Sequence, residues 1–419
     1  MISAVGKLLP ACLCGALLIG CAGGGASGTR AAGAVPAGGS QAVAVAPRGG
    51  VRRPASVPTC SGGSGFIGGG FDNVAFGTES GVLEGSQNEV CEGNSAIANG
   101  FSNTISGGGA AYDSFIGSGQ ANTITGSAEY GFIGGGDDNT LTAQGGAISG
   151  GAGNQNAGTD ATLGAGASNN ITSAATYGVI GGGSTNTLSA EYGVIAGGTN
   201  NTVSGEGAYI AAGGYNTASG EGALVDGGFK NTAAGTFATI PGGYANSAAG
   251  TYSFAAGVHA SAIQNGTFVW SDGSNGDATL ASTAAYQFLA RAAGGYTLWT
   301  NAAATVGAKL APGSGTWASA SDRNLKTDVG RIDDAAVLDK VATLPIERWS
   351  YKSERGVRHV GPMAQDFYAA FGVGEDDKHI TSIDEDGVAL AAIKALHAEN
   401  VALKREVQRL SAKVDALAR

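Results

Sequence analysis

The chain has 419 residues, of which 75 are glycine and only 13% are charged, and its formal net charge is −10. The glycines follow no three-residue period, which excludes collagen, and the regular recurrence of Ile, Val, Leu, Phe and Tyr argues against disorder. Repetitive β-structure is the fold class that accommodates so much glycine and asparagine.

Residues 1–20 read as a lipoprotein-type signal peptide, because Lys7 precedes an apolar run shorter than the roughly 18 residues of a membrane helix. The stretch "LIGC", which ends at Cys21, resembles the lipobox of bacterial lipoproteins, in which the cysteine is acylated and becomes the mature N-terminus. The resemblance implies an exported lipoprotein anchored to a membrane through Cys21, with the outer membrane or cell surface as its expected location. An ordinary secretory signal with a coincidental cysteine is the alternative.

Residues 21–62 are rich in Gly, Ala and Pro and show no helical or strand period, which is typical of a flexible tether. Cys60 and Cys91 would lie in an oxidising compartment, where a disulfide is possible, and their pairing stays open. The cysteines and histidines lack metal-site spacing, so neither a metal nor a cofactor is predicted.

From residue 63 to 262 one pattern recurs: an apolar pair, glycines, two variable residues, Asn, a small residue and Gly, as in "YGVIGGGSTNTLSAE". A fixed short period predicts a solenoid whose units bury apolar faces against their neighbours. Fifteen residues suit one coil of two short strands and two tight turns. The marker asparagines lie mostly 15 residues apart, with spacings of 19 and 17 after the third and fourth, at Asn73, Asn88, Asn103, Asn122, Asn139, Asn154, Asn170, Asn186, Asn201, Asn216, Asn231 and Asn246.

The apolar pairs of the repeat, such as Val179 and Ile180, are expected to point into the coil or toward a partner chain. Gly–Asn repeats of this kind resemble the β-roll heads of trimeric autotransporter adhesins and phage fibres, which implies a homotrimer. The predicted fold is therefore mainly β with an α-helical C-terminus: a parallel β-roll or β-solenoid, a short β-region, and a mixed α/β module ending in a coiled coil.

The repeat carries 14 acidic residues and one basic residue, Lys230. Such a surface repels nucleic acid and anionic membranes, so neither is expected as a ligand. Residues 263–317 then alternate apolar and polar side chains around aromatic anchors, which predicts a transition region of paired strands that ends the repeat.

Residues 318–419 form the predicted terminal module, and within it 388–418 read as a coiled-coil helix. β-branched residues at a and Leu at d favour a dimer in peptides, whereas the repeat favours a trimer; Asn400, at an a position, is expected to fix the register. The heptad seam runs through Ile393, Leu396, Asn400, Leu403, Val407, Leu410, Val414 and Leu417.

The segments "SDRNLKTDVGRI", "LPIERWSYK" and "RHVGPMAQDF" precede this helix in that order. The arrangement resembles the intramolecular chaperone auto-processing domain that ends phage endosialidases and tail fibres. The resemblance implies a domain that assists trimerisation and then cuts itself off as a single-turnover serine endopeptidase. In the family, the Ser of "SDxxxK" is the nucleophile and the Lys its partner, positions that here are Ser321 and Lys326, with Ala320–Ser321 as the scissile bond.

The residue chemistry agrees with that implication. A serine hydroxyl is a poor nucleophile until a base takes its proton, and a lysine serves as that base only when it is neutral. Residues i and i+5 lie on different sides of a helix and on opposite faces of a strand. The stretch must therefore turn, or Lys326 must reach Ser321 of another chain.

Structural roles for the same residues remain open. Ser321 or Asp322 can N-cap a short helix while Lys326 stays solvated. His359 and Gln365 match the family's "H-x-G-x-x-A-Q" segment, and they would either orient the dyad or hold the fold.

The sequence thus predicts a trimeric, adhesin-like surface fibre with a self-removing C-terminal chaperone, and a cell-surface receptor or glycan as partner. Two rivals remain. One is a phage-derived tail fibre that binds or degrades glycans, and the other is a structural module that trimerises without cutting.

Overall fold

The computed structural model describes residue 63 and residues 65–418. The predictions for the signal peptide, the tether and Cys21 therefore lie outside the described residues, as does Cys60 of the possible Cys60–Cys91 pair. The described chain divides into two compact units, the first ending at Ala293 and the second beginning at Gly294.

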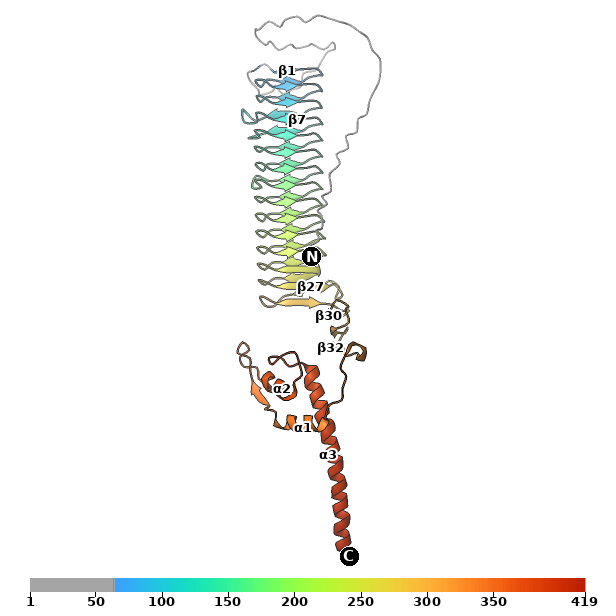
Figure 1. The fold of residues 1–419 in the computed structure, drawn as a ribbon. Coiled ribbons are helices and arrows are strands. Elements are labelled where there is room, and N and C mark those ends of the chain that lie inside the picture. Colours follow the sequence, from blue (N-terminus) through green and yellow to red (C-terminus); the bar gives the residue numbers. More distant parts are fainter. Residues whose placement is uncertain (1–62, 64, 419) are drawn as a thin grey trace, which may run out of the picture. The chain divides into compact units, whose positions relative to one another are not determined.

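The first unit is a parallel β-solenoid of two long sheets, which confirms the fold predicted from the repeat (Figure 1). Each coil contributes one short strand to each sheet, and every strand pairs with its equivalent in the next coil, as Val179 pairs with Val194. The odd-numbered sheet contains β1 (Phe66–Ile67), β3 (Gly81–Val82), β5 (Ala96–Ile97), β7 (Phe115–Ile116), β9 (Phe132–Ile133), β11 (Ala147–Ile148), β13 (Thr162–Leu163), β15 (Val179–Ile180), β17 (Val194–Ile195), β19 (Tyr209–Ile210), β21 (Leu224–Val225), β23 (Thr239–Ile240), β25 (Phe254–Val258), β27 (Phe268–Asp272) and β29 (Phe288–Arg291).

The second long sheet is built from the even-numbered strands, with the same parallel order. It contains β2 (Val74–Ala75), β4 (Glu89–Val90), β6 (Thr104–Ser106), β8 (Thr123–Thr125), β10 (Thr140–Leu141), β12 (Gln155–Asn156), β14 (Asn170–Ile171), β16 (Thr187–Leu188), β18 (Thr202–Val203), β20 (Thr217–Ala218), β22 (Thr232–Ala233), β24 (Ser247–Ala248), β26 (Ala260–Ala262) and β28 (Leu280–Ala281).

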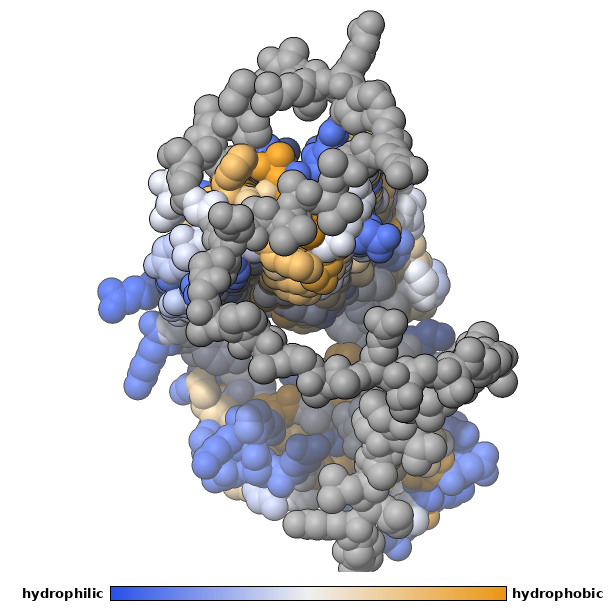
Figure 2. Space-filling model, turned by 90° about the horizontal axis from the view of Figure 1, so that it is seen from above, coloured by the Kyte–Doolittle hydropathy of each residue, from blue (hydrophilic) through white to orange (hydrophobic). Residues whose placement is uncertain are grey.

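The core lies between the two sheets. Because side chains alternate across a strand, the second residue of each apolar pair, such as Ile180 or Ile195, is fully buried inside the coil. The first residue faces outward, and Val179 remains 37% exposed. The second residue of each pair therefore points into the coil, and the first residue forms part of the solenoid surface. Hydrophobic surface also shows at the first coil when the molecule is viewed from above (Figure 2), where Phe66 and Phe71 are exposed.

Glycine is required where the chain reverses between the two sheets. Gly198 has φ +93°, and a Cβ added there would lie 2.2 Å from the carbonyl oxygen of Gly213 in the next coil. The coils therefore stack backbone against backbone at this corner, and any side chain would separate them. At the opposite corner non-glycine residues accept the left-handed region, as Tyr192 does with φ +55°.

The marker asparagines form a hydrogen-bonded ladder inside the coils. Asn186 Nδ2 donates to the Gly182 carbonyl at 3.1 Å and to the Gly198 carbonyl at 3.0 Å. Its Oδ1 accepts the backbone N–H of Asn201 at 3.0 Å. Each amide thus closes its own turn and bonds to the next coil, so a group that would be costly to bury is satisfied on every side.

The predicted position of one marker asparagine, Asn170, is wrong by one residue. Asn169, not Asn170, occupies the ladder: Asn169 is fully buried and its backbone N–H donates to Asn154 Oδ1 at 3.0 Å. Asn170 begins β14. Two adjacent asparagines look alike in a repeat pattern, and only their direction from the backbone separates them.

The solenoid sheets extend past residue 262, which the Gly–Asn period suggests as their limit. β27 and β29 continue the odd-numbered sheet to Arg291 because the backbone pairing persists after the marker asparagine is lost. Arg291 Nη2 donates to Ser271 Oγ at 2.7 Å. Asp272 accepts the N–H of Ala293 at 2.6 Å, and this bond is the main cause that lowers its pKa to about 2.

The second unit holds a small antiparallel sheet and the helical module. The sheet consists of β30 (Tyr296–Trp299), β31 (Gly307–Leu310) and β32 (Trp317–Ser319). The module contains the 3-10 helix η1 (Arg323–Leu325), α1 (Asp334–Thr343), β33 (Glu347–Trp349), β34 (His359–Gly361), α2 (Ala364–Phe371) and α3 (Ser382–Leu417). Helix α3 begins ahead of residue 388, and no helix among the described residues is long and apolar enough to cross a membrane.

Removing one asparagine from the ladder tests its contribution to stability. Asn186→Ala should lower the free energy of unfolding by about 1–3 kcal/mol, because buried peptide groups of its own turn and of the next coil lose their partners. Thermal and urea unfolding of the purified protein measure the change. Asn275→Ala, at an exposed asparagine of the β27–β28 loop, is the control and should unfold like the wild type. Equal stability of both variants would refute the role of the ladder.

Candidate functional site

The Ser321–Lys326 segment follows directly after β32. The backbone N–H of Ala320 donates to the Gly307 carbonyl at 3.1 Å, so the residue before Ser321 is still held against β31. Asp322 then N-caps η1, its Oδ1 accepting the N–H of Asn324 at 2.9 Å. The candidate scissile bond therefore lies where a sheet ends and a capped 3-10 turn begins.

That turn brings the two predicted catalytic side chains together. Lys326 leaves η1 in an extended conformation, and its Nζ donates to Ser321 Oγ at 2.7 Å. The turn that the five-residue separation requires for a contact within one chain is therefore present. The N-capping role of Asp322 and the Ser–Lys contact coexist, since the cap makes the turn that the contact needs.

Both side chains of this pair are exposed in the single chain. A lysine accepts a proton only as a neutral amine, and burial favours the neutral form by penalising the ammonium charge. The hydroxyl and the amine lie 2.7 Å apart, within hydrogen-bond distance, while both side chains are exposed to solvent.

The comparison with protein families falls on this segment. Residues 321–372 match the family described as "Chaperone of endosialidase". The C-terminal module contains a chaperone-of-endosialidase domain. The match begins at Ser321, the predicted nucleophile, and the matched family is classed among the peptidases. No curated protein matches the chain.

The matched domain ends where α2 ends. Gly372 closes α2 in the left-handed conformation, its N–H donating to the Tyr368 carbonyl at 2.8 Å. Helix α3 follows outside the match and packs against α1, and Lys394 of α3 forms an ion pair with Asp334 of α1. The buried residues of α3 are Ala391, Ala392 and Ala395. The chaperone-of-endosialidase domain is therefore joined to the long helix by contacts of its first helix.

His359 lies in an aromatic cluster of the chaperone-of-endosialidase domain. Its ring stacks on Trp349 at 4.7 Å between centroids and meets Tyr351 edge-on at 5.7 Å. Its Nε2 lies 3.5 Å from the Glu354 carboxylate. These contacts hold the β33–β34 hairpin, in line with the structural alternative for this residue.

Gln365 stands in the first turn of α2, next to Ala364. Among the described residues, the side-chain hydrogen bond of Lys326 goes to Ser321, and neither residue bonds to His359 or Gln365. The structure therefore brings together Ser321, Asp322 and Lys326 from the predicted set, and leaves the other two apart from them within one chain.

Sequence reasoning did not anticipate a second feature, a groove on the solenoid surface beside Tyr112, Glu129 and Gln144. The sequence does contain a signal that could have indicated the groove: the long spacings after Asn103 and Asn122 mark coils with inserted residues. Residues that are 15 positions apart in the sequence, such as Glu129 and Gln144, meet in space because equivalent positions of successive coils lie side by side.

Proposed function

We propose that this chain is an exported, lipid-anchored surface fibre whose C-terminal chaperone assembles three copies and then cleaves itself off between Ala320 and Ser321. The observation that carries the proposal is the 2.7 Å hydrogen bond between Lys326 Nζ and Ser321 Oγ at the first residue of the chaperone-of-endosialidase domain.

The cleavage chemistry follows from the position of the nucleophile. Ser321 supplies both the hydroxyl that attacks and the amide nitrogen that leaves, so Oγ reaches the Ala320 carbonyl through a five-membered ring. Lys326 accepts the hydroxyl proton and returns it to the amide nitrogen as the C–N bond breaks, leaving an ester. Water then hydrolyses the ester, giving a carboxylate at Ala320 and restoring the hydroxyl of Ser321, now the N-terminus of the fragment.

The proposed assembly rests first on α3. The apolar side chains of its heptad seam are exposed in the single chain, with Ile393 and Leu403 each at 62%. A helix of this length with an unburied apolar stripe is stabilised by packing that stripe against equivalent helices. This supports association through α3, and the trimer is proposed over the dimer because of the repeat that precedes it.

The outer face of the odd-numbered sheet supports the same association. Its outward positions carry stacked phenylalanines: Phe254, Phe268 and Phe288 lie with ring centroids 4.7 Å apart from one to the next. Phe115 and Phe132 stack at 6.2 Å on the same face. Aligned apolar rings on a solenoid surface suit contact with the same face of another copy.

Assembly would also control cleavage. Ser321 and Lys326 are exposed in one chain, so the neutral amine that the reaction needs would come from desolvation between subunits. We infer that the chain cuts only after the copies have packed, and that the cut then makes assembly irreversible.

The location and anchor are proposed from the sequence alone. Residues 1–20 would direct export, Cys21 would carry the acyl chains, and residues 21–62 would hold the solenoid away from the membrane.

Cleavage is tested with matched substitutions. Wild-type protein should release a fragment that begins at Ser321, whereas Ser321→Ala and Lys326→Arg should stay whole, with rates reduced by roughly 10³-fold or more. Arginine keeps the cation but cannot act as the base. Mass spectrometry and N-terminal sequencing of the products measure the cut. Ser353→Ala and Lys352→Arg are the controls and should cut normally; an active Lys326→Arg would eliminate lysine as the base.

Assembly is tested on α3 in the Ser321→Ala background, which keeps the helix attached. Leu403→Asp should weaken or abolish the trimer, because a carboxylate would be buried in the seam. Ala402→Asp adds the same charge beside the seam and should leave the trimer intact. Analytical ultracentrifugation gives the mass of each variant. A monomeric parent protein would overturn the assembly proposal whatever the variants do.

Lipid attachment is tested at Cys21. Cys21→Ser should lose incorporation of labelled palmitate and leave the membrane fraction, because the acceptor thiol is gone. Cys14→Ser, inside the predicted signal peptide, is the control and should label like the wild type. Membrane fractionation of Cys21→Ser identical to that of the wild type would rule out an anchor at this residue.

A further inference from the structure

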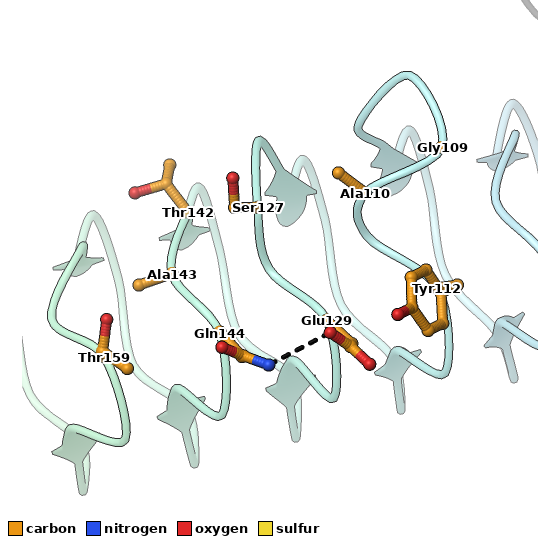
Figure 3. Close-up of a pocket in the computed structure, with 9 residues that line it drawn as sticks. All are labelled: Gly109, Ala110, Tyr112, Ser127, Glu129, Thr142, Ala143, Gln144 and Thr159. Atoms are coloured by element: carbon orange, nitrogen blue, oxygen red, sulfur yellow. Dashed lines mark hydrogen bonds between the residues drawn. The ribbon is translucent and has the colours of Figure 1, made fainter.

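A polar groove of about 450 Å³ lies along one edge of the solenoid, independent of the proposed cleavage site (Figure 3). Its wall includes Tyr112, Glu129, Gln144 and Thr159, which occupy equivalent positions in four successive coils. Because neighbouring coils are separated by about 4.8 Å, these four residues span roughly 14 Å along the edge. The groove is therefore elongated along the solenoid axis.

The groove exists because two coils carry insertions. The coil that follows Asn103 bulges outward at Gly107–Ala110 and forms one end of the groove. The bulge is fixed by Glu92, a carboxylate only 3% exposed, which accepts the backbone N–H groups of Gly107 and Gly109. A buried carboxylate is costly unless it is hydrogen bonded, so these bonds both satisfy Glu92 and stabilise the bulge.

The polar side chains inside the groove are also held in place. Gln144 Nε2 donates to Glu129 Oε2 at 3.0 Å, and Figure 3 shows Glu129 between Gln144 and the Tyr112 ring. Tyr130 packs edge-on against Tyr112 with centroids 6.5 Å apart. The pKa of each tyrosine hydroxyl is raised, first by hydrogen bonding to the Glu129 side chain and then by further causes that include its charge. An aromatic wall and an oriented carboxylate–amide pair thus face the same space.

This combination matches the surface of a sugar. A pyranose ring presents C–H groups on one face, which pack on an aromatic ring, and vicinal hydroxyls at its edge. A carboxylate accepts two such hydroxyls, and an amide both donates and accepts. The hydroxyls of Ser127, Thr142 and Thr159 add further donors and acceptors along the wall. Apolar peptides would find too few apolar contacts here.

The negative charge in and around the groove disfavours acidic sugars. Glu129 lies in the groove and Asp113 and Glu92 lie beside it in the chain's coils, whereas the repeat has one basic residue, Lys230, several coils away. An anionic saccharide would meet like charge at each of these positions. The structure points to a neutral ligand.

We propose that this groove is a binding site for a neutral oligosaccharide, stacked on Tyr112 and hydrogen bonded by Glu129 and Gln144. The stretch from Tyr112 to Thr159 provides contacts for several consecutive sugar rings. The solenoid then binds glycans through inserted coils, while its regular coils supply the scaffold.

The test measures binding to the full-length Ser321→Ala protein by calorimetry. The probes are neutral hexasaccharides of glucose, mannose and galactose, with polysialic acid as the acidic arm. At least one neutral probe should bind, and Tyr112→Ala and Glu129→Gln should each weaken it by roughly tenfold or more. Glu206→Gln and Tyr252→Ala change residues on the same edge away from the groove and should bind like the parent.

Three outcomes would overturn the proposal: no binding of any neutral probe at millimolar concentration, binding of polysialic acid alone, or equal losses in the groove variants and the controls. Thermal unfolding of each variant separates a lost contact from a lost fold, and Glu129→Gln keeps the size of the side chain it replaces. Cleavage at Ala320–Ser321 is independent of all these results.

Discussion

The structure depends on a single recurring interaction, the asparagine amide that bonds to its own turn and to the coil beside it. A coil with two-residue strands has too little backbone pairing to hold its register alone, so the buried amides fix where each coil sits on the next. Once the register is fixed, isoleucine stacks on isoleucine in the core and glycine faces glycine at the corner. Equivalent outer positions line up as well, which is why outward phenylalanines stack from coil to coil and why the groove residues meet.

The repeat fold could be predicted from the sequence because the asparagine period directly reflects the hydrogen-bonded ladder. The prediction was wrong where the asparagine pattern and the ladder do not correspond. Asn169 and Asn170 are adjacent and chemically identical, so the period could not distinguish the buried one. The end of the solenoid was also invisible, since β27 and β29 keep the backbone pairing without the asparagine. Backbone hydrogen bonds require no particular side chain, so the sequence pattern does not show where the strand pairing ends.

In the candidate site, too, contacts between residues close in the sequence could be predicted better than contacts that depend on tertiary structure. Ser321 and Lys326 were identified by a motif, but their contact required a turn that the spacing alone did not determine. Asp322 supplies it by capping η1, a local effect that a sequence can suggest. His359 behaves differently, because its place in an aromatic cluster depends on β33 and β34 pairing. The groove required residues from four coils to come together, and only the inserted residues hinted at it.

The solenoid also has a property that follows from its pairing scheme. Because each coil bonds only to the coils beside it, one whole fifteen-residue unit can be gained or lost without disturbing any other contact. The addition or removal of one unit would change the length of the solenoid by about 4.8 Å, the spacing of neighbouring strands. The length of the solenoid is therefore independent of the segments that precede and follow it in the chain.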